Sequence, residues 1–128
     1  MEGENIDKKY NITDAELEIM KEIWKKEGQT FKELFEKLEK EKPRNKNTVK
    51  TLLYRLVKKD AIWIAIFDEI DEKVRYWAGA LIKEVYLKEE NEKFLNKLYE
   101  GSAQKLILQL IEDKKIDKEE IKKLLNLD

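Results

Sequence analysis

The sequence predicts a mainly α-helical fold with a small β-hairpin. Three amphipathic segments precede Lys59, and apolar residues recur in them at intervals of three and four. Between Ala61 and Trp77 the residues are largely β-branched and aromatic, which favours strands. Helical periodicity returns at about Ala80 and continues to the C-terminus. The predicted order is therefore three helices, one hairpin and a helical arm.

The composition restricts the possible functions before any motif is considered. A length of 128 residues suits one domain with a dependent arm. The net charge of -1 gives no global attraction to nucleic acid, so any such attraction must be local. The chain has no Cys and no His, and it has no Gly-rich phosphate loop. We therefore expect no metal, no cofactor and no enzymatic activity. No apolar run approaches the roughly 18 to 20 residues that span a bilayer, so we expect a cytoplasmic protein without membrane insertion.

The first two predicted helices are marked by capping signals. The first runs from about Asp14 to Lys26, and the Thr13–Glu16 segment forms its capping box. The second begins with the same device at Thr30–Glu33. It ends before Pro43, because the residue that precedes a proline disfavours the helical conformation.

The third predicted helix begins at about Asn45 or Asn47 and ends at Lys59. Its inner face consists of the apolar residues Val49, Leu52, Leu53, Leu56 and Val57. Its outer face, at intervals of three and four, consists of Asn47, Lys50, Thr51, Tyr54, Arg55 and Lys58. Three short helices followed by a hairpin form a winged helix-turn-helix, which we predict for residues 1–79.

Basic residues are concentrated at this third helix. The stretch from Lys42 to Lys59 carries seven of them and no acidic residue. Asn and Arg can make bidentate contacts with base edges, and Lys can pair with phosphates. We predict contacts with a double-stranded DNA operator from Arg44, Lys46, Asn47, Thr48, Lys50, Thr51, Tyr54, Arg55 and Lys58. The alternative is a solvated basic face without a ligand.

Residues 80–128 are predicted to form a dimerisation domain of three helices. These helices run from about Ala80 to Gly101, from Ser102 to Ile111 and from Asp117 to Leu127. One extended arm cannot hide so much apolar surface, so a second copy of the chain is expected to cover it. The residues predicted to form the homodimer are Leu95, Leu98, Leu106, Leu110, Ile111, Ile121, Leu124 and Leu125.

Four segments resemble the BlaI/MecI penicillinase-repressor family. They read ITDAELEIMKEIW at Ile12–Trp24, NTVKTLLYRLVKK at Asn47–Lys59, RYW at Arg75–Trp77 and KFLNKLYEGSAQKLILQLIED at Lys93–Asp113. The resemblance implies a winged-helix DNA-binding domain, a helical dimerisation arm and repression of β-lactam-resistance genes. It also implies operator contacts from the positions that match the family's, which are Thr48, Lys50, Thr51 and Arg55.

The same resemblance implies regulation by proteolysis. Family members leave DNA after cleavage within the arm, which makes a membrane-bound sensor protease a candidate partner. The equivalent bond here is Lys93–Phe94, whereas the best-known members carry Asn before that Phe. Ordinary helix packing of Phe94 is the alternative interpretation.

The predicted wing differs from a basic DNA-binding wing. Five acidic residues and no basic residue lie between Lys59 and Lys73: Asp60, Asp68, Glu69, Asp71 and Glu72. These carboxylates would repel a duplex, so we expect the wing to stand off the DNA. The strand Ile62–Phe67 lacks polar alternation, which predicts that both of its faces are covered. Trp63 and Phe67 either pack on the arm or neighbouring helices, or form a docking surface for another protein.

Two functional hypotheses follow from the sequence. The first is a homodimeric repressor that binds a pseudo-palindromic operator, with half-sites about one helical turn or a multiple apart. The alternative is a protein-binding winged helix, or an antirepressor that acts by heterodimerisation through the arm.

Overall fold

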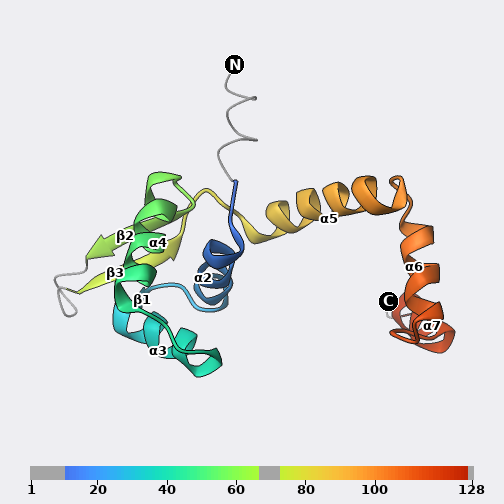
Figure 1. Cartoon of the computed structure of the whole chain (residues 1–128), viewed down its shortest axis with the longest axis horizontal. Helices are drawn as coiled ribbons and strands as arrows, with labels where there is room; N and C mark the ends of the chain where they lie inside the picture. The colour runs from blue at the N-terminus through green and yellow to red at the C-terminus, as the bar shows by residue number, and fades with distance from the viewer. Residues whose placement is uncertain (1–10, 67–72, 127–128) are drawn as a thin grey trace, which may run out of the picture. The chain divides into compact units, whose positions relative to one another are not determined.

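The computed structural model describes residues 11–66 and 73–126. The chain divides into two compact units between Lys83 and Glu84. Figure 1 shows helices in both units and the three described strands in the first. The predicted fold class, mainly helical with a small antiparallel sheet, is confirmed.

The helices of the first unit are α2 (Asp14–Lys25), α3 (Phe31–Glu41) and α4 (Lys46–Lys58). Both predicted capping boxes are present. In the first, the Thr13 hydroxyl accepts the backbone N–H of Glu16 at 3.1 Å, and Glu16 Oε1 accepts that of Thr13 at 2.9 Å. These bonds satisfy backbone donors that have no partner within the helix.

The three helices bury their apolar stripes in a shared core, with α2 packed against both α3 and α4. The core residues on these helices are Ile19, Met20, Ile23, Leu34, Phe35, Leu38, Val49, Leu52, Leu53 and Leu56. The predicted inner face of α4 is therefore confirmed, except that Val57 is only partly buried.

The sheet holds one strand that the sequence pattern did not predict. Its strands β1 (Gln29–Thr30), β2 (Ile62–Ile66) and β3 (Val74–Ala78) lie in the order β1-β3-β2, and both pairings are antiparallel. Gly28 makes the approach to β1 possible, because its φ is +82° and its N–H donates to the Tyr76 carbonyl at 2.8 Å. A two-residue strand has too few positions to show a period of its own.

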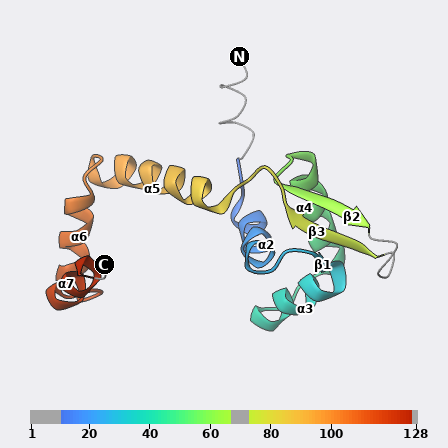
Figure 2. The ribbon, with the colours of Figure 1, turned by 180° about the vertical axis from the view of Figure 1, so that it is seen from behind.

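The expected covering of both faces of β2 is wrong for the described part of the strand. Trp63, Ile64 and Ile66 are more than half exposed, whereas Ile62 is fully buried. Trp63 lies close to Gly79 of the adjoining loop, where an added Cβ would be 2.8 Å from the indole Nε1. Beyond Ile62, β2 and β3 run side by side past the helices, so the core leaves the outer half of β2 uncovered (Figure 2). The remaining wing residues, Phe67, Asp68, Glu69, Asp71 and Glu72, lie outside the described residues.

The second unit contains most of α5 (Lys83–Tyr99), with α6 (Ala103–Glu112) and α7 (Lys118–Leu125). The predicted start at Ala80 is three residues early, because the Ala80 N–H donates to the Asp60 carbonyl at 2.8 Å and not to a helical turn. Ser102 and Asp117 are the N-caps of the last two helices, each of which begins one residue after its predicted start. None of the helices in the described ranges has the length and apolar character needed to cross a membrane.

Candidate nucleic-acid interface

The outer face of α4 is the candidate interface. Burial of the opposite side fixes which residues point outward. The side chain of Asn45 caps the helix and accepts the Thr48 N–H at 3.1 Å, so the first turn is ordered. Eight of the nine residues predicted from the sequence are exposed: Lys46, Asn47, Thr48, Lys50, Thr51, Tyr54, Arg55 and Lys58.

Aromatic rings and one backbone carbonyl hold several of these side chains in place. The ammonium groups of Lys46 and Lys50 lie 5.8 and 5.3 Å from the ring centroids of Phe35 and Phe31 on α3. Such exposed cation–π contacts contribute about 0.5 to 1 kcal/mol each and restrict where the charges sit. The Thr51 hydroxyl donates to the Asn47 carbonyl at 2.9 Å. The two phenylalanines were not among the predicted site residues, because they belong to a different helix.

Three cations of the basic stretch are held by carboxylates of α2. Arg44 Nη1 lies 2.7 Å from Glu18 Oε1, and the Arg44 side chain is only 10% exposed. Lys42 Nζ lies 3.5 Å from the other oxygen of Glu18. Lys59 Nζ lies 2.7 Å from Glu16 Oε1. The cations that remain on the outer face are Lys46, Lys50, Arg55 and Lys58.

Glu16 is a buried charge that joins the start of α2 to the end of α4. It is 1% exposed, and its partner Lys59 also donates to the Asn11 carbonyl at 2.8 Å. Burial acts to raise the pKa of Glu16, but the hydrogen bonds from Lys59 and Thr13 and the charge of Lys59 outweigh it. The pKa of Glu16 is therefore lowered, and the carboxylate is ionised at neutral pH.

The lowered pKa of Glu16 predicts an acid-sensitive contribution to stability. The unfolded state binds this proton more readily, so the contribution is full above the usual pKa of 4.5 and is lost as the pH falls through the lowered value. Glu16→Gln is expected to cost about 1 to 3 kcal/mol at neutral pH, because Lys59 loses its charged partner. Urea unfolding from pH 7 to pH 3 should show this cost shrinking. The exposed Glu36→Gln is the control, and a cost independent of pH would contradict a role for the charge.

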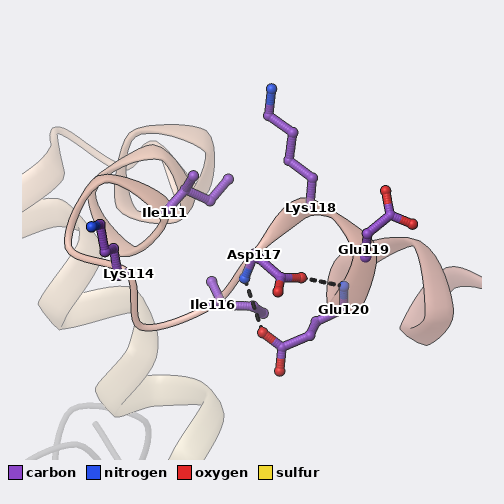
Figure 3. A pocket seen from close by; sticks show the side chains of 7 residues that line it. All are labelled: Ile111, Lys114, Ile116, Asp117, Lys118, Glu119 and Glu120. Atoms are coloured by element: carbon purple, nitrogen blue, oxygen red, sulfur yellow. Dashed lines mark hydrogen bonds between the residues drawn. The ribbon is translucent and has the colours of Figure 1, made fainter.

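The residues predicted to form the homodimer lie in the second unit with varying exposure. Leu98, Leu124 and Leu125 are 58%, 61% and 75% exposed. The others are half-buried: Leu95, Leu106, Leu110, Ile111 and Ile121. An open pocket of about 580 Å³ lies between the end of α6 and the start of α7. Figure 3 shows Ile111 and Ile116 at this pocket, beside the reciprocal capping bonds of Asp117 and Glu120.

The bond proposed for cleavage lies inside a helix. Lys93 and Phe94 belong to α5, whose helical residues extend to Tyr99. Phe94 is 45% exposed, and its ring centroid lies 5.8 Å from that of Tyr99. A protease that needs extended backbone would require α5 to open locally at this point.

Known proteins place the chain in one family. The family model described as penicillinase repressor matches residues 12–127. The penicillinase repressor of Bacillus licheniformis is 31% identical over 113 residues, which cover 88% of this chain and 85% of the relative. The methicillin resistance regulatory protein MecI of Staphylococcus aureus strain N315 is 31% identical over 121 residues, 94% of each chain. A penicillinase repressor of Staphylococcus aureus is 32% identical over 118 residues, 91% of this chain and 90% of the relative. The chain therefore belongs to the penicillinase repressor family.

Proposed function

We propose that this chain is a transcriptional repressor of resistance genes that binds a pseudo-palindromic DNA operator as a homodimer. Residues 1–79 form the DNA-binding domain in this proposal, and residues 80–128 form the dimerisation domain. Relatives named as penicillinase and methicillin-resistance regulators support the regulatory role. The proposal includes no catalytic step.

One observation carries the DNA-binding part of the proposal. The outer face of α4 combines four cations with hydroxyl and amide groups, and the Lys42–Lys59 stretch that contains it has no carboxylate. A helix of this kind suits the major groove, where Arg and Asn read base edges and Lys pairs with phosphates. The contacts with Phe35 and Phe31 hold the ammonium groups of Lys46 and Lys50 on this face in the absence of a ligand.

Selection of bound duplexes from a random pool tests this function directly. The full chain is expected to enrich a sequence with two-fold symmetry and half-sites about one helical turn, or a multiple, apart. Sedimentation of the complex is expected to give two chains per duplex. A pool that shows no enrichment, together with no salt-dependent binding to any duplex, would contradict the proposal.

The apolar residues of the arm support a homodimer. Within a single chain, Leu98, Leu124 and Leu125 expose most of their side-chain surface to water. A two-fold symmetric contact would bury each of these residues twice, once from each copy. The area removed from water would then drive association at about 25 cal/mol per Å².

Leu124→Asp is expected to separate the dimer without unfolding the chain. Leu124 is 61% exposed in the single chain, so the change removes little intramolecular packing. In a dimer the substitution would remove the roughly 1.5 to 3 kcal/mol gained by burying each leucine. The dissociation constant would therefore rise at least about tenfold. Sedimentation at several protein concentrations measures the shift. Asn126→Asp, an exposed position that gains the same charge, is the control, and equal dissociation of the two variants would argue against this contact.

The exposed wing favours a second function as the alternative. Ile64 and Ile66 on one face of the edge strand β2, and Trp63 on the other, expose apolar side chains, which suit a protein partner better than a phosphate backbone. A protein-binding winged helix, or an antirepressor that forms heterodimers, would show no salt-dependent preference for any duplex. The selection experiment separates the two functions.

Release from DNA completes the proposal. A membrane-bound sensor protease that cuts Lys93–Phe94 would break α5 and detach the dimerisation residues beyond it. Mass spectrometry of the chain recovered after induction would locate the cut.

A further inference from the structure

One carboxylate of α2 binds two cations beside the start of α4. Glu18 Oε1 lies 2.7 Å from Arg44 Nη1, and Glu18 Oε2 lies 3.5 Å from Lys42 Nζ. Glu41 adds a longer contact of 3.7 Å to Arg44 Nη2. The side chain of Arg44 is 10% exposed and that of Glu18 is 36% exposed. Arg44 therefore faces carboxylates of two helices and presents little charge to solvent.

This ion-pair cluster lies where recognition helices meet DNA. Glu18, Lys42 and Arg44 line one cavity of about 420 Å³ together with Asn45 and Thr48, the cap and an early residue of α4. In helix-turn-helix proteins, the residues that read bases concentrate near this end of the helix. The hydrogen bond from Arg44, assisted by Lys42, holds the pKa of Glu18 below its usual range. Glu18 is therefore negatively charged at neutral pH, next to the groups expected to read the operator.

Neutralising a cation at this place removes a possible contact that does not depend on the DNA sequence. Phosphate contacts raise the affinity for every sequence, whereas contacts with base edges discriminate between sequences. A carboxylate that engages Lys42 and Arg44 removes possible phosphate contacts and leaves the outer-face residues Lys50 and Arg55 untouched. It therefore lowers the affinity for specific and non-specific duplexes alike.

We propose that Glu18 limits the affinity for DNA and its salt dependence by keeping Lys42 and Arg44 from DNA phosphates, while Arg44 positions α4 against α2. This inference rests on the proposed DNA-binding function. It assigns Arg44 a positioning role, in contrast with the phosphate or base contact predicted from the sequence.

Glu18→Gln tests the inference, because it keeps the shape of the side chain and removes its charge. Binding is measured on the selected duplex and on a scrambled duplex of equal length, over a series of salt concentrations. Both duplexes are expected to bind about two- to fivefold more tightly for each additional exposed ion pair. The slope of log affinity against log salt is expected to steepen by about 0.9 for each of the two cations that gains a phosphate contact. The ratio of specific to non-specific affinity is expected to stay the same, because a phosphate contact strengthens binding to every sequence.

The matched control is Glu92→Gln, an exposed position on α5 that makes the same change in net charge. Its salt slope is expected to equal that of the wild type. Partial loss of folded protein would lower the active concentration but would not alter the slope. The salt slopes can therefore be compared even if a variant is slightly less stable. Equal slopes for Glu18→Gln and the wild type would overturn the inference.

Arg44→Gln and the double variant complete the test. Arg44→Gln alone is expected to leave the salt slope unchanged, because Arg44 is already paired and Glu18 still binds Lys42. In the Glu18→Gln background, the same substitution is expected to return the slope toward the wild-type value. A slope about 0.9 shallower in Arg44→Gln alone would mean that Arg44 contacts phosphate in the wild type, and would refute the inference.

The outcomes also separate this inference from the proposed function. A wild-type chain that binds no duplex in a salt-dependent way would refute both. A wild-type chain that binds the selected duplex, with an unaltered slope in Glu18→Gln, would refute only the role of Glu18.

Discussion

Arg55→Ala is expected to weaken binding to the selected duplex by about 1 to 3 kcal/mol, roughly five- to 150-fold. Arg55 is exposed in the middle of the outer face of α4, one turn beyond Thr51. Its planar guanidinium can donate two parallel hydrogen bonds to a guanine edge, which alanine cannot replace. Titration of labelled duplex, followed by fluorescence anisotropy, measures the change.

The pattern over several sequences distinguishes base contacts from phosphate contacts. Loss of a base contact weakens the selected duplex and relaxes the preference at one position. Loss of a phosphate contact weakens all duplexes alike and reduces the salt slope by about 1. Lys50→Ala is compared with Lys88→Ala, an exposed lysine of α5 that loses the same charge. Equal affinities of Arg55→Ala, Lys50→Ala and the wild type would mean that the outer face of α4 does not contact DNA.

Leu56→Ala is expected to lower the free energy of unfolding by about 2 to 5 kcal/mol. Leu56 is 0% exposed on the inner face of α4, which packs against α2. Removing its side-chain atoms forfeits their burial and leaves a cavity that the neighbouring helices can only partly fill. Urea unfolding at one fixed protein concentration measures the loss.

The neighbouring residue Arg55 provides the matched control for this stability change. It lies on the same helix but on the opposite, exposed face, so Arg55→Ala is expected to change stability by no more than about 0.5 kcal/mol. Arg55→Ala should therefore lower the affinity for DNA with little effect on stability, whereas Leu56→Ala should lower the free energy of unfolding. A loss below about 1 kcal/mol for Leu56→Ala would contradict the tight packing of α4 in the core.

Much of the first unit could be predicted because its signals are local. The capping boxes at Thr13 and Thr30 fixed where α2 and α3 begin, and the spacing of Val49, Leu52 and Leu56 fixed the inner face of α4. Each of these signals spans no more than about two helical turns, so neighbouring residues suffice to specify it.

The predictions from sequence were wrong where the structure of an element depends on residues that are far away in the chain. Strand β1 exists because Gln29 and Thr30 pair with β3, more than forty residues later in the chain. The exposure of Trp63 reflects how far the core extends along β2, which its apolar residues alone do not reveal. Ala80 is excluded from α5 because its N–H is bound to the Asp60 carbonyl.

The sequence by itself determined the fold class, the boundaries of most helices and the outward face of α4. It also located the basic stretch, but it could not tell which of those cations are available to a ligand. The tertiary structure decided that, because Glu18 meets Arg44 across 26 positions and Glu16 meets Lys59 across 43. Coulomb attraction depends on distance in space and on burial, and neither is set by the spacing of charges along the chain.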